Sequence, residues 1–330
     1  MSEFDQGSRE SGEASGDDAA GGSGLICVHP DRSMTDLAVG GGWIYAVEPY
    51  AVVRFTPGSE PEPVLERERV FASLACDEQA LYVALINDGE IWRIGHEDGR
   101  AECLATGCER PMSIQCRGGW LTWLDCPFIT HPKLGAPYSI SIAVLCGMSC
   151  HGGAVGRYGR LEDGGWDPAV IGDRVAWVTG AGEDSRIVCV RAPGGSIETL
   201  IGDLEDVDRD GGFVHLASTG DALVVAKPTR SWLRAGVELR RYRFVGDGAA
   251  LAGERIDFVA GHFNGLDANE HGIGLVVERS GDIRARYWGP DGLQGSLSVP
   301  RQAGPLVKPT VAPDGLYFAV GAELFRLCLD

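Results

Sequence analysis

Long apolar runs are missing from this sequence. The longest candidate, residues 140–145, falls far short of the roughly 18 apolar residues that a membrane-spanning helix needs. The chain as given also shows no signal peptide. No P-loop, dinucleotide-binding fingerprint or G-x-S-x-G motif occurs. We therefore expect no transmembrane segment and none of the enzymes that depend on these three motifs.

Positive charge is scarce. The chain has 29 Lys and Arg against 47 Asp and Glu, which gives a formal net charge of −18. Nucleic acids and anionic membranes repel such a protein, so we expect neither as a partner. A helical period is missing too, because the apolar residues alternate or form short runs close to Gly or Pro. These patterns predict an all-β protein.

Four short strands can be recognised in residues 72–104. Residues 73–76 and 81–86 are apolar and are separated by a polar turn at 77–79. The sequence Asn87-Asp88-Gly89 is typical of a hairpin turn, and residues 90–94 and 101–104 give two further strands. Four antiparallel strands in about 35 residues are, when repeated, typical of a propeller blade.

The aliphatic residue that begins the second strand of this unit recurs along the chain, at intervals, by subtraction, of 37 to 54 residues. These residues are Ile44, Leu81, Leu121, Val175, Leu223, Ile273 and Leu316. Seven copies predict a seven-bladed β-propeller of four-stranded antiparallel blades, whose closed ring leaves no long sheet edge exposed. Seven hairpins in a sandwich, or two separate domains, are the alternatives.

The last unit is incomplete, and a spare strand lies at the other end of the chain. Residues 308–311, 316–320 and 323–329 give three strands, while residues 25–28 (LICV) precede the first full unit. We expect the N-terminal strand to complete the seventh blade and close the ring. Cys27 and Cys328 would then lie on neighbouring strands, at a separation that a disulfide bond permits. We predict this disulfide, and two unpaired thiols are the alternative.

Residues 1–24 differ in composition from the rest of the chain. They are rich in Gly, Ser, Asp and Glu, with Phe4 as their single aromatic residue, and cannot bury enough surface to offset the entropy of ordering. We expect a disordered tail at 1–24 and one propeller domain at 25–330, in a monomer. Ten cysteines favour an oxidising compartment and hence an extracytoplasmic location, periplasmic, surface-tethered or secreted. A cytoplasmic protein with buried thiols is the alternative.

Three cysteines surround an irregular segment of the third unit. Cys126 precedes this segment, Cys146 and Cys150 follow it, and His131 lies within it. Because no C-x-x-C occurs in the chain, the spacing does not fit the usual zinc patterns. We predict a disulfide of Cys126 with Cys146 or Cys150, and zinc is the alternative.

Two other cysteine pairs have different interpretations. Cys103 and Cys108 bracket the turn before the third unit and are placed to close a small loop by a disulfide. Cys76 and Cys116 both lie at the end of the first strand of their units, and we interpret them as small core residues.

An acidic stretch between the fourth and fifth units matches the start of a calcium-binding loop. Asp206, Asp208 and Asp210 alternate as hard oxygen ligands, and Gly211 allows the sharp turn that calcium loops make. The twelfth position is Ala217 rather than Glu, so the stretch is not an EF-hand. Calcium is therefore a candidate cofactor, and a solvated acidic turn is the alternative.

The repeated unit resembles a known group of propellers. It consists of a small apolar strand, an Asp or Gly turn, an aliphatic–aromatic strand, a Gly turn and an apolar–Arg strand such as AVVRF at 51–55 or EIWRI at 90–94. This pattern, over residues 25–330, resembles the TolB-like and NHL-like propellers, which occur in many bacterial extracytoplasmic proteins. The chain is also similar at fold level to streptogramin lyase, but without a matching set of catalytic His and Glu residues. The tail resembles the tether of bacterial lipoproteins.

Propellers commonly bind ligands at the face formed by the inter-blade loops and the loops that join second to third strands. By this analogy we place the ligand-binding residues at Asp36, Tyr50, Asp88, His131, Trp166, Asp167, His215, Trp232, His262 and Asn264. We expect His215 and His262, from neighbouring units, to converge. The prediction is a binding or scaffolding module for a peptide, glycan or protein partner. The alternative is a lyase or hydrolase with a metal or histidine at the funnel mouth.

Overall fold

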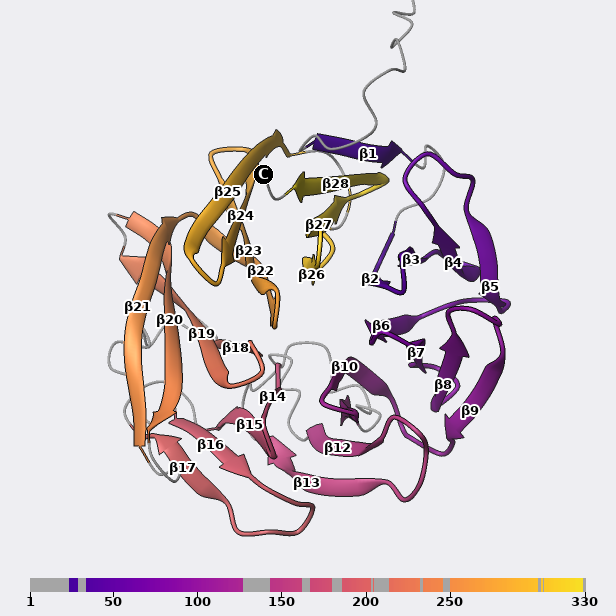
Figure 1. The fold of residues 1–330 in the computed structure, drawn as a ribbon, viewed down its shortest axis with the longest axis horizontal. Coiled ribbons are helices and arrows are strands. Elements are labelled where there is room, and N and C mark those ends of the chain that lie inside the picture. Colours follow the sequence, from indigo (N-terminus) through magenta and orange to yellow (C-terminus); the bar gives the residue numbers. More distant parts are fainter. Residues whose placement is uncertain are drawn as a thin grey trace, which may run out of the picture.

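The computed structural model describes residues 24–28, 34–126, 143–161, 167–179, 186–202, 204, 214–231, 234–245, 250–301, 304 and 306–328. These residues form seven four-stranded antiparallel sheets. The sheets are arranged like blades around a common axis (Figure 1). Side chains of several inner strands line a cavity along this axis, which we call the central channel. The predicted seven-bladed all-β propeller is therefore confirmed. No helix in the described part of the chain is long and apolar enough to cross a membrane.

Each blade runs from an inner strand at the channel to an outer strand at the rim (Figure 1). Blade 1 consists of β2 (Leu37–Gly40), β3 (Trp43–Val47), β4 (Ala51–Phe55) and β5 (Glu62–Glu66). Blade 2 consists of β6 (Ala72–Cys76), β7 (Ala80–Leu85), β8 (Glu90–Gly95) and β9 (Ala101–Ala105). Blade 3 consists of β10 (Pro111–Arg117), β11 (Trp120–Asp125), β12 (Ala143–Ser149) and β13 (Gly156–Leu161).

The later blades follow the same order. Blade 4 consists of β14 (Ala169–Ile171), β15 (Arg174–Thr179), β16 (Arg186–Val190) and β17 (Glu198–Ile201). Blade 5 consists of β18 (His215–Ser218), β19 (Ala222–Ser231), β20 (Arg234–Val245) and β21 (Ala250–Ala260). Blade 6 consists of β22 (His262–Asn269), β23 (Gly272–Arg279), β24 (Asp282–Gly289) and β25 (Gly292–Pro300). Blade 7 consists of β26 (Thr310–Ala312), β27 (Gly315–Val320), β28 (Glu323–Cys328) and β1 (Gly24–Val28).

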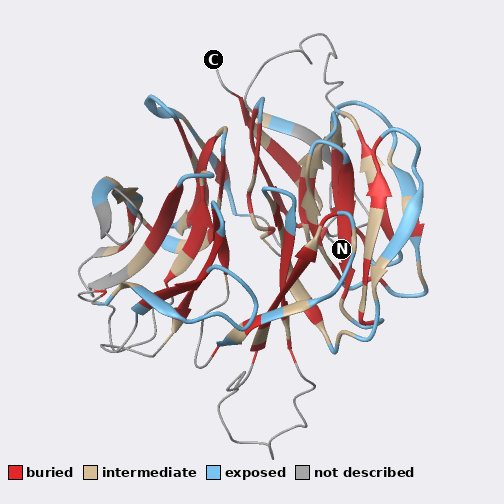
Figure 2. Ribbon diagram, turned by 60° about the horizontal axis from the view of Figure 1, so that its bottom comes forward, coloured by how far each residue is buried: buried red, intermediate tan, exposed pale blue. Residues whose placement is uncertain are grey.

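Blade 2 explains the apolar runs of the second strands. All six residues of β7 are buried, because the neighbouring blades cover both faces of a middle strand. Leu81 and Val83 pack into the core shared with blade 1, whereas Tyr82 and Ala84 pack into the core shared with blade 3. A strand with side chains alternating between two cores is apolar at every position. Figure 2 shows the same pattern around the ring, with buried inner strands and exposed turns.

Paired glycines form two of the turns beside the channel. Gly41 and Gly42 have φ angles of 59° and 79°, and Gly118 and Gly119 have φ angles of 56° and 78°. Two successive residues with positive φ are typical of the type I′ turn, whose twist matches that of the strands it joins. Residues other than glycine are strained at positive φ. The two Gly-Gly pairs therefore allow these tight turns between the first and second strands of blades 1 and 3.

The N-terminal strand closes the ring as predicted, because β1 pairs antiparallel with β28 in blade 7. A bulge between Leu25 and Cys27 sets Cys27 opposite Leu324, while Cys328 lies opposite Gly315 on β27. Leu324 and Cys328 are four residues apart on one strand, about 13 Å at the usual strand rise. That distance is far beyond the Cα separation of a disulfide. The predicted Cys27–Cys328 disulfide is therefore wrong.

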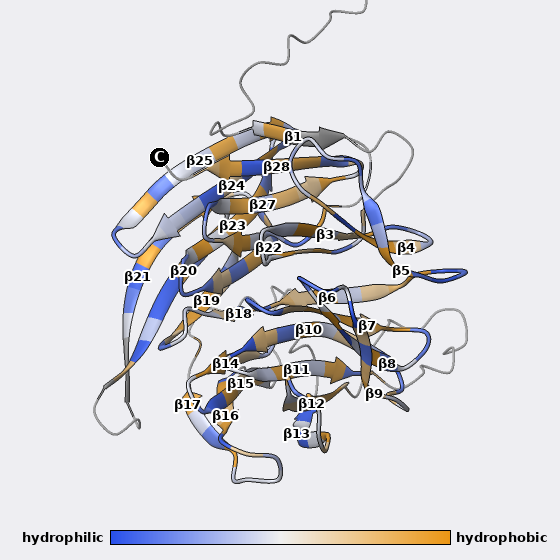
Figure 3. Ribbon diagram, turned by 45° about the vertical axis from the view of Figure 1, so that its right-hand side comes forward, coloured by the Kyte–Doolittle hydropathy of each residue, from blue (hydrophilic) through white to orange (hydrophobic). Residues whose placement is uncertain are grey.

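The outer strands carry much of the polar surface. β20 and β21, with 12 and 11 residues, show long hydrophilic stretches in Figure 3. Arg241 and Arg243 both pair with Glu254, at 2.6 and 3.4 Å. Exposed ion pairs of this kind contribute little to stability. The rim of blade 5 is therefore a solvated surface of paired charges.

Candidate functional site

Two adjoining cavities lie along the central channel. We call the first the channel cavity. It has a volume of about 320 Å³ and is lined mainly by the inner strands of blades 1, 2 and 3 and by residues 308–311. The second, the turn cavity, has a volume of about 880 Å³ and opens among the turns that join first to second strands. Both cavities are lined by Val39, Cys76, Cys116, Arg117, Asn269 and Val311, so they meet along the channel.

Asp167 connects three blades at the channel cavity. His215 Nδ1 donates a hydrogen bond to Asp167 Oδ2 at 2.7 Å, and Lys308 Nζ lies 3.6 Å from Oδ1. Burial alone would raise the pKa of Asp167, but the charge of Lys308 and the hydrogen bond from His215 outweigh it and lower the pKa to about 2. Asp167 is therefore ionised at neutral pH. The ring of His215 also stacks on Phe263, with centroids 3.8 Å apart.

Two other carboxylates of the channel cavity bind backbone amides of the next blade. Asp36, just before blade 1, accepts a hydrogen bond from Leu74 N of blade 2 at 2.8 Å. Asp267, in blade 6, accepts one from Val311 N of blade 7 at 2.8 Å. Burial raises the pKa of Asp36 despite the amide hydrogen bonds that act to lower it. Because these bonds satisfy buried donors on inner strands, both carboxylates hold neighbouring blades together.

The residues predicted to bind a ligand do not form one cluster. Asp36 and Asp167 both line the channel cavity, and His215 contacts Asp167 there. His262 is exposed, and within the described residues it forms no hydrogen bond or ring contact with His215, whose ring stacks on the neighbouring Phe263. Asn264 donates to His262 O at 3.5 Å.

The remaining predicted residues lie away from this cluster or outside the description. Tyr50 is 65% exposed and Asp88 pairs with Arg67 at 3.7 Å, and neither lines the channel cavity. Several predicted residues lie outside the described residues, namely His131, Trp166 and Trp232 of the ligand-binding face and Asp206, Asp208 and Asp210 of the calcium loop.

The turn cavity was not predicted. Blades 1, 2, 3, 6 and 7 border it, and its charged lining consists of Asp77, Glu78, Glu270, Asp314, Arg117 and Arg326. Arg326 pairs with Asp314 at 3.1 Å, and Arg117 donates to Asp267 at 3.3 Å. Glu78 is exposed and has no ion pair among the residues that the structure describes. The acids therefore exceed the bases, and the bases are already paired. In the sequence, the residues that line the turn cavity look like ordinary turn and strand residues of the repeat, so nothing there indicated a cavity.

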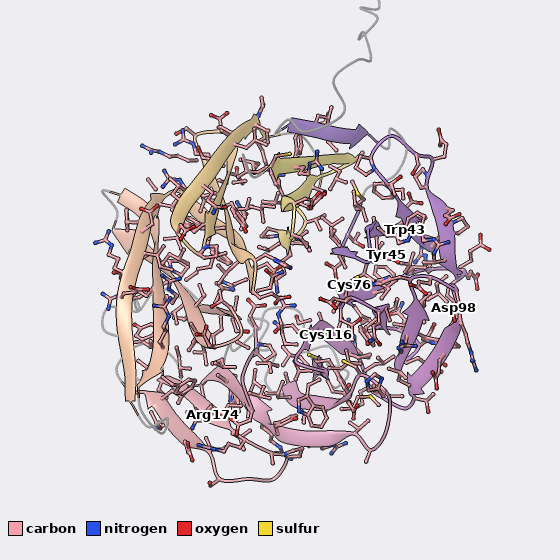
Figure 4. All side chains as sticks on the ribbon, in the orientation of Figure 1. Trp43, Tyr45, Cys76, Asp98, Cys116 and Arg174 are labelled. Atoms are coloured by element: carbon pink, nitrogen blue, oxygen red, sulfur yellow. The ribbon has the colours of Figure 1, made fainter. Side chains whose placement is uncertain are left out.

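A buried thiol pair lies where the two cavities meet. Cys116 Sγ is 3.2 Å from Cys150 Sγ and 3.7 Å from Asp77 Oδ2. The hydrogen bond between the thiols, together with burial, raises the pKa of Cys116, and the same bond lowers the pKa of Cys150. Cys76 and Cys116 lie toward the channel in neighbouring blades (Figure 4). Cys116 is a buried core residue, as its place in the repeat predicted, and its thiol also contacts Cys150 and Asp77.

The other predicted disulfides are not formed. Cys146 packs into the core between blades 2 and 3, whereas Cys126 packs into the core between blades 3 and 4. The two lie on opposite faces of one sheet, which rules out a bond between them. Cys103 and Cys108 are free thiols, and Cys103 Sγ donates to Ala105 O at 3.4 Å. These pairings, like the one proposed for ring closure, are corrected by the structure.

Comparison with known proteins shows the fold alone. No protein-family model and no curated protein matches the sequence. The chain is similar to a chain of the mitotic checkpoint complex, with a TM-score of 0.59, 13% identity and 99% of each chain covered. It is similar to an acylaminoacyl peptidase of Pyrococcus horikoshii, with a TM-score of 0.59, 11% identity, and 90% of this chain and 52% of that chain covered. For TolB of Acinetobacter baumannii the TM-score is 0.50, with 12% identity and coverage of 84% and 65%. The chain is a β-propeller with distant structural similarity to TolB.

Proposed function

We propose that this protein is a binding module that receives a positively charged peptide segment of a partner protein in the turn cavity. The fold supports a binding role, since a rigid ring of blades holds turns of different sequence around one opening. The observation that carries the proposal is the turn cavity itself, about 880 Å³ in volume and bordered by five blades. Known ligand sites have volumes of roughly 300–1,000 Å³.

The charge of the turn cavity favours a basic ligand. Arg117 and Arg326 are paired with acids, while Glu78 and Glu270 lie exposed at its rim. The net charge of −18 adds long-range attraction for a cationic partner. An oligosaccharide is the competing ligand, because Trp43 lines the same cavity. Arg54 already lies 4.4 Å from the centroid of that indole ring, which leaves it less free to stack on a sugar.

Fluorescence anisotropy with labelled peptides tests this proposal. Peptides of equal length carrying Lys and Arg are expected to bind, and the same peptides with Glu and Asp are not. Gln79→Trp, at an exposed position in the cavity wall, is expected to block binding, whereas Glu102→Trp on the exposed outer strand β9 is expected to leave it unchanged. Equal affinity for acidic and basic peptides, or tighter binding of a set of neutral oligosaccharides, would contradict the proposal.

One observation favours the second candidate, a lyase or hydrolase. The hydrogen bond from His215 to Asp167 orients an imidazole beside the channel cavity, as in histidines that act as general bases. Against it, Asp167 also pairs with Lys308 and His215 stacks on Phe263. Turnover of a substrate from a broad hydrolase or lyase panel that disappears in His215→Ala, with folding retained, would favour the enzyme.

We also propose an extracytoplasmic location, because the repeated unit resembles the propellers of many bacterial extracytoplasmic proteins. Fractionation of the native host tests it, and recovery of the protein from the cytosolic fraction would contradict it.

A further inference from the structure

Three potential metal ligands meet in the wall of the turn cavity. Asp77 follows β6, Cys116 lies near the end of β10, and Cys150 follows β12, so the group joins blades 2 and 3. One ligand atom from each residue lies within 4.8 Å of the other two. Cys150 is fixed in place by its backbone N–H, which donates to Gly119 O at 2.9 Å. Residues far apart in the sequence are thus held around one point.

We propose that Asp77, Cys116 and Cys150 form a binding site for a thiophilic divalent metal ion of the zinc class. Zinc bonds of about 2.3 Å to sulfur and about 2.0–2.2 Å to carboxylate oxygen, in tetrahedral geometry, separate sulfur and oxygen by about 3.6 Å and the two sulfurs by about 3.8 Å. Cys116 Sγ and Asp77 Oδ2 are 3.7 Å apart. The sulfurs, at 3.2 Å, need to separate by only about half an ångström.

The carboxylate of Asp77 is already oriented toward the sulfurs. Its Oδ1 accepts hydrogen bonds from the backbone N–H groups of Gln79 and Ala80, both at 2.8 Å. Its Oδ2 accepts one from the Tyr82 hydroxyl at 2.7 Å. Partners that fix a ligand in this way are typical of metal sites, where they hold the donor atom in place. The same oxygen faces Cys116, whose thiol proton the metal would replace.

Charge and access also suit a metal ion. Two thiolates and one carboxylate bring three negative charges to the site. The positive charge of Arg117 favours the thiolate form of Cys116, and that of Arg93 favours the thiolate form of Cys150. All three ligands line the turn cavity, so an ion can enter from solvent and a fourth coordination position can face the cavity. Soft sulfur ligands select zinc and related ions over magnesium and calcium.

The carboxylate distinguishes this site from two simpler roles of the cysteines. A pair of core thiols needs no charged neighbour, whereas the half-buried carboxylate of Asp77 lies beside this pair, 3.7 Å from Cys116 Sγ. A redox-active dithiol needs no carboxylate, whereas Asp77 Oδ2 lies within reach of the thiol pair and is held there by the Tyr82 hydroxyl. A metal ion uses all three groups, and the disulfide is an outcome that the experiment can detect.

Metal analysis of the reduced, EDTA-treated protein after equilibration with zinc tests the inference. We expect one ion per chain in the wild type and in Cys189→Ser, which removes a buried thiol from blade 4. Cys116→Ser and Cys150→Ser are expected to lose the ion, and Tyr82→Phe to bind it roughly tenfold more weakly. Circular dichroism checks that each variant is folded. Unchanged stoichiometry in Cys116→Ser, or equal loss in Cys189→Ser, would overturn the site.

Cobalt substitution of the wild type tests the site without depending on whether any variant folds. Cobalt bound by two thiolates is expected to show sulfur-to-metal charge-transfer absorption and tetrahedral ligand-field bands. A featureless spectrum would overturn the proposal. So would a reduced protein that binds no metal and forms, on air oxidation, a Cys116–Cys150 disulfide seen as a mass lower by two hydrogens. The inference does not depend on the peptide proposed for the same cavity, because zinc and cobalt alone are the probes.

Discussion

The ion group around Asp167 is expected to make stability depend on pH below about 4. The pKa of Asp167 is about 2 in the folded protein and about 3.9 in an unfolded chain. A carboxyl with a depressed folded pKa contributes stability that is fully present above the unfolded pKa and is lost as pH falls through the folded pKa. The difference, close to two pKa units, corresponds to about 2.5 kcal/mol at neutral pH. Its side chain is only 18% exposed, so solvent screening reduces this figure little.

Asp167→Asn removes this contribution. Urea unfolding between pH 2 and 7 is expected to show a deficit of about 2 kcal/mol for the variant at pH 7. The deficit shrinks to about 0.4 kcal/mol near pH 2, because wild-type Asp167 is half protonated at its folded pKa. Asp291→Asn, at an exposed turn position, is the matched control and is expected to show no such pH-dependent deficit. Lys308→Met is expected to move the low-pH loss of stability to higher pH. A deficit of Asp167→Asn that stays constant from pH 7 to pH 2 would refute the reasoning.

Three further predictions follow from the turns, from a buried histidine and from the closing strand. Gly89→Ala places a Cβ inside van der Waals distance of the Cys108 carbonyl oxygen at φ +67°, whereas Gly99→Ala at φ +63° meets nothing. In urea unfolding we expect Gly99→Ala to lower the free energy of unfolding by about 1–2 kcal/mol and Gly89→Ala to lower it clearly more. Equal losses in the two variants would contradict the close approach of residue 89 to the Cys108 carbonyl oxygen. Burial lowers the pKa of His96 below 6.5. The unfolded chain therefore binds a proton more readily than the folded protein, and stability is expected to fall as pH drops below 6.5. His96→Phe is expected to lose this part of the pH dependence, and a pH–stability profile identical to that of the wild type would contradict the prediction. Deletion through residue 28 is expected to lower the melting temperature and promote aggregation by exposing the edge of β28. Deletion through residue 23 is the control, and equal melting temperatures would argue against ring closure by β1.

The fold could be predicted because its signals are local. The apolar run at 81–86 and the turn at 87–89 describe one hairpin completely, and the same pattern recurs in each blade. Ring closure followed from a missing strand at one end and a spare strand at the other. The register of that closure did not follow. β1 pairs antiparallel with β28, from Gly24 opposite Arg326 to Val28 opposite Glu323, so Cys27 lies toward the end of β28 that is remote from Cys328. The short apolar run LICV does not fix this register, and the Cys27–Cys328 prediction failed for that reason.

The candidate site was largely invisible in the sequence because the ring assembles it. Asp77 and Cys150 each occupy an ordinary turn or strand-end position in their own repeat. Strand pairing within blade 3 brings Cys150 to Cys116, and only the packing of blade 2 against blade 3 adds Asp77. The analogy with other propellers placed Asp36, Asp167 and His215 on a ligand-binding face. It did not indicate Lys308, which reaches the channel cavity only because the segment before β26 of blade 7 lies beside the channel.

The turn cavity is tested most directly as the binding site by hydrogen–deuterium exchange, with and without the tightest-binding basic peptide. Protection is expected at residues 39–44, 76–79, 116–119 and 269–271, which line the turn cavity, and no change is expected in the outer strands β5, β9 and β13. Protection confined to the inter-blade residues 67–71 and 106–110, with the turn cavity unchanged, would contradict the assignment of the binding site to the turn cavity.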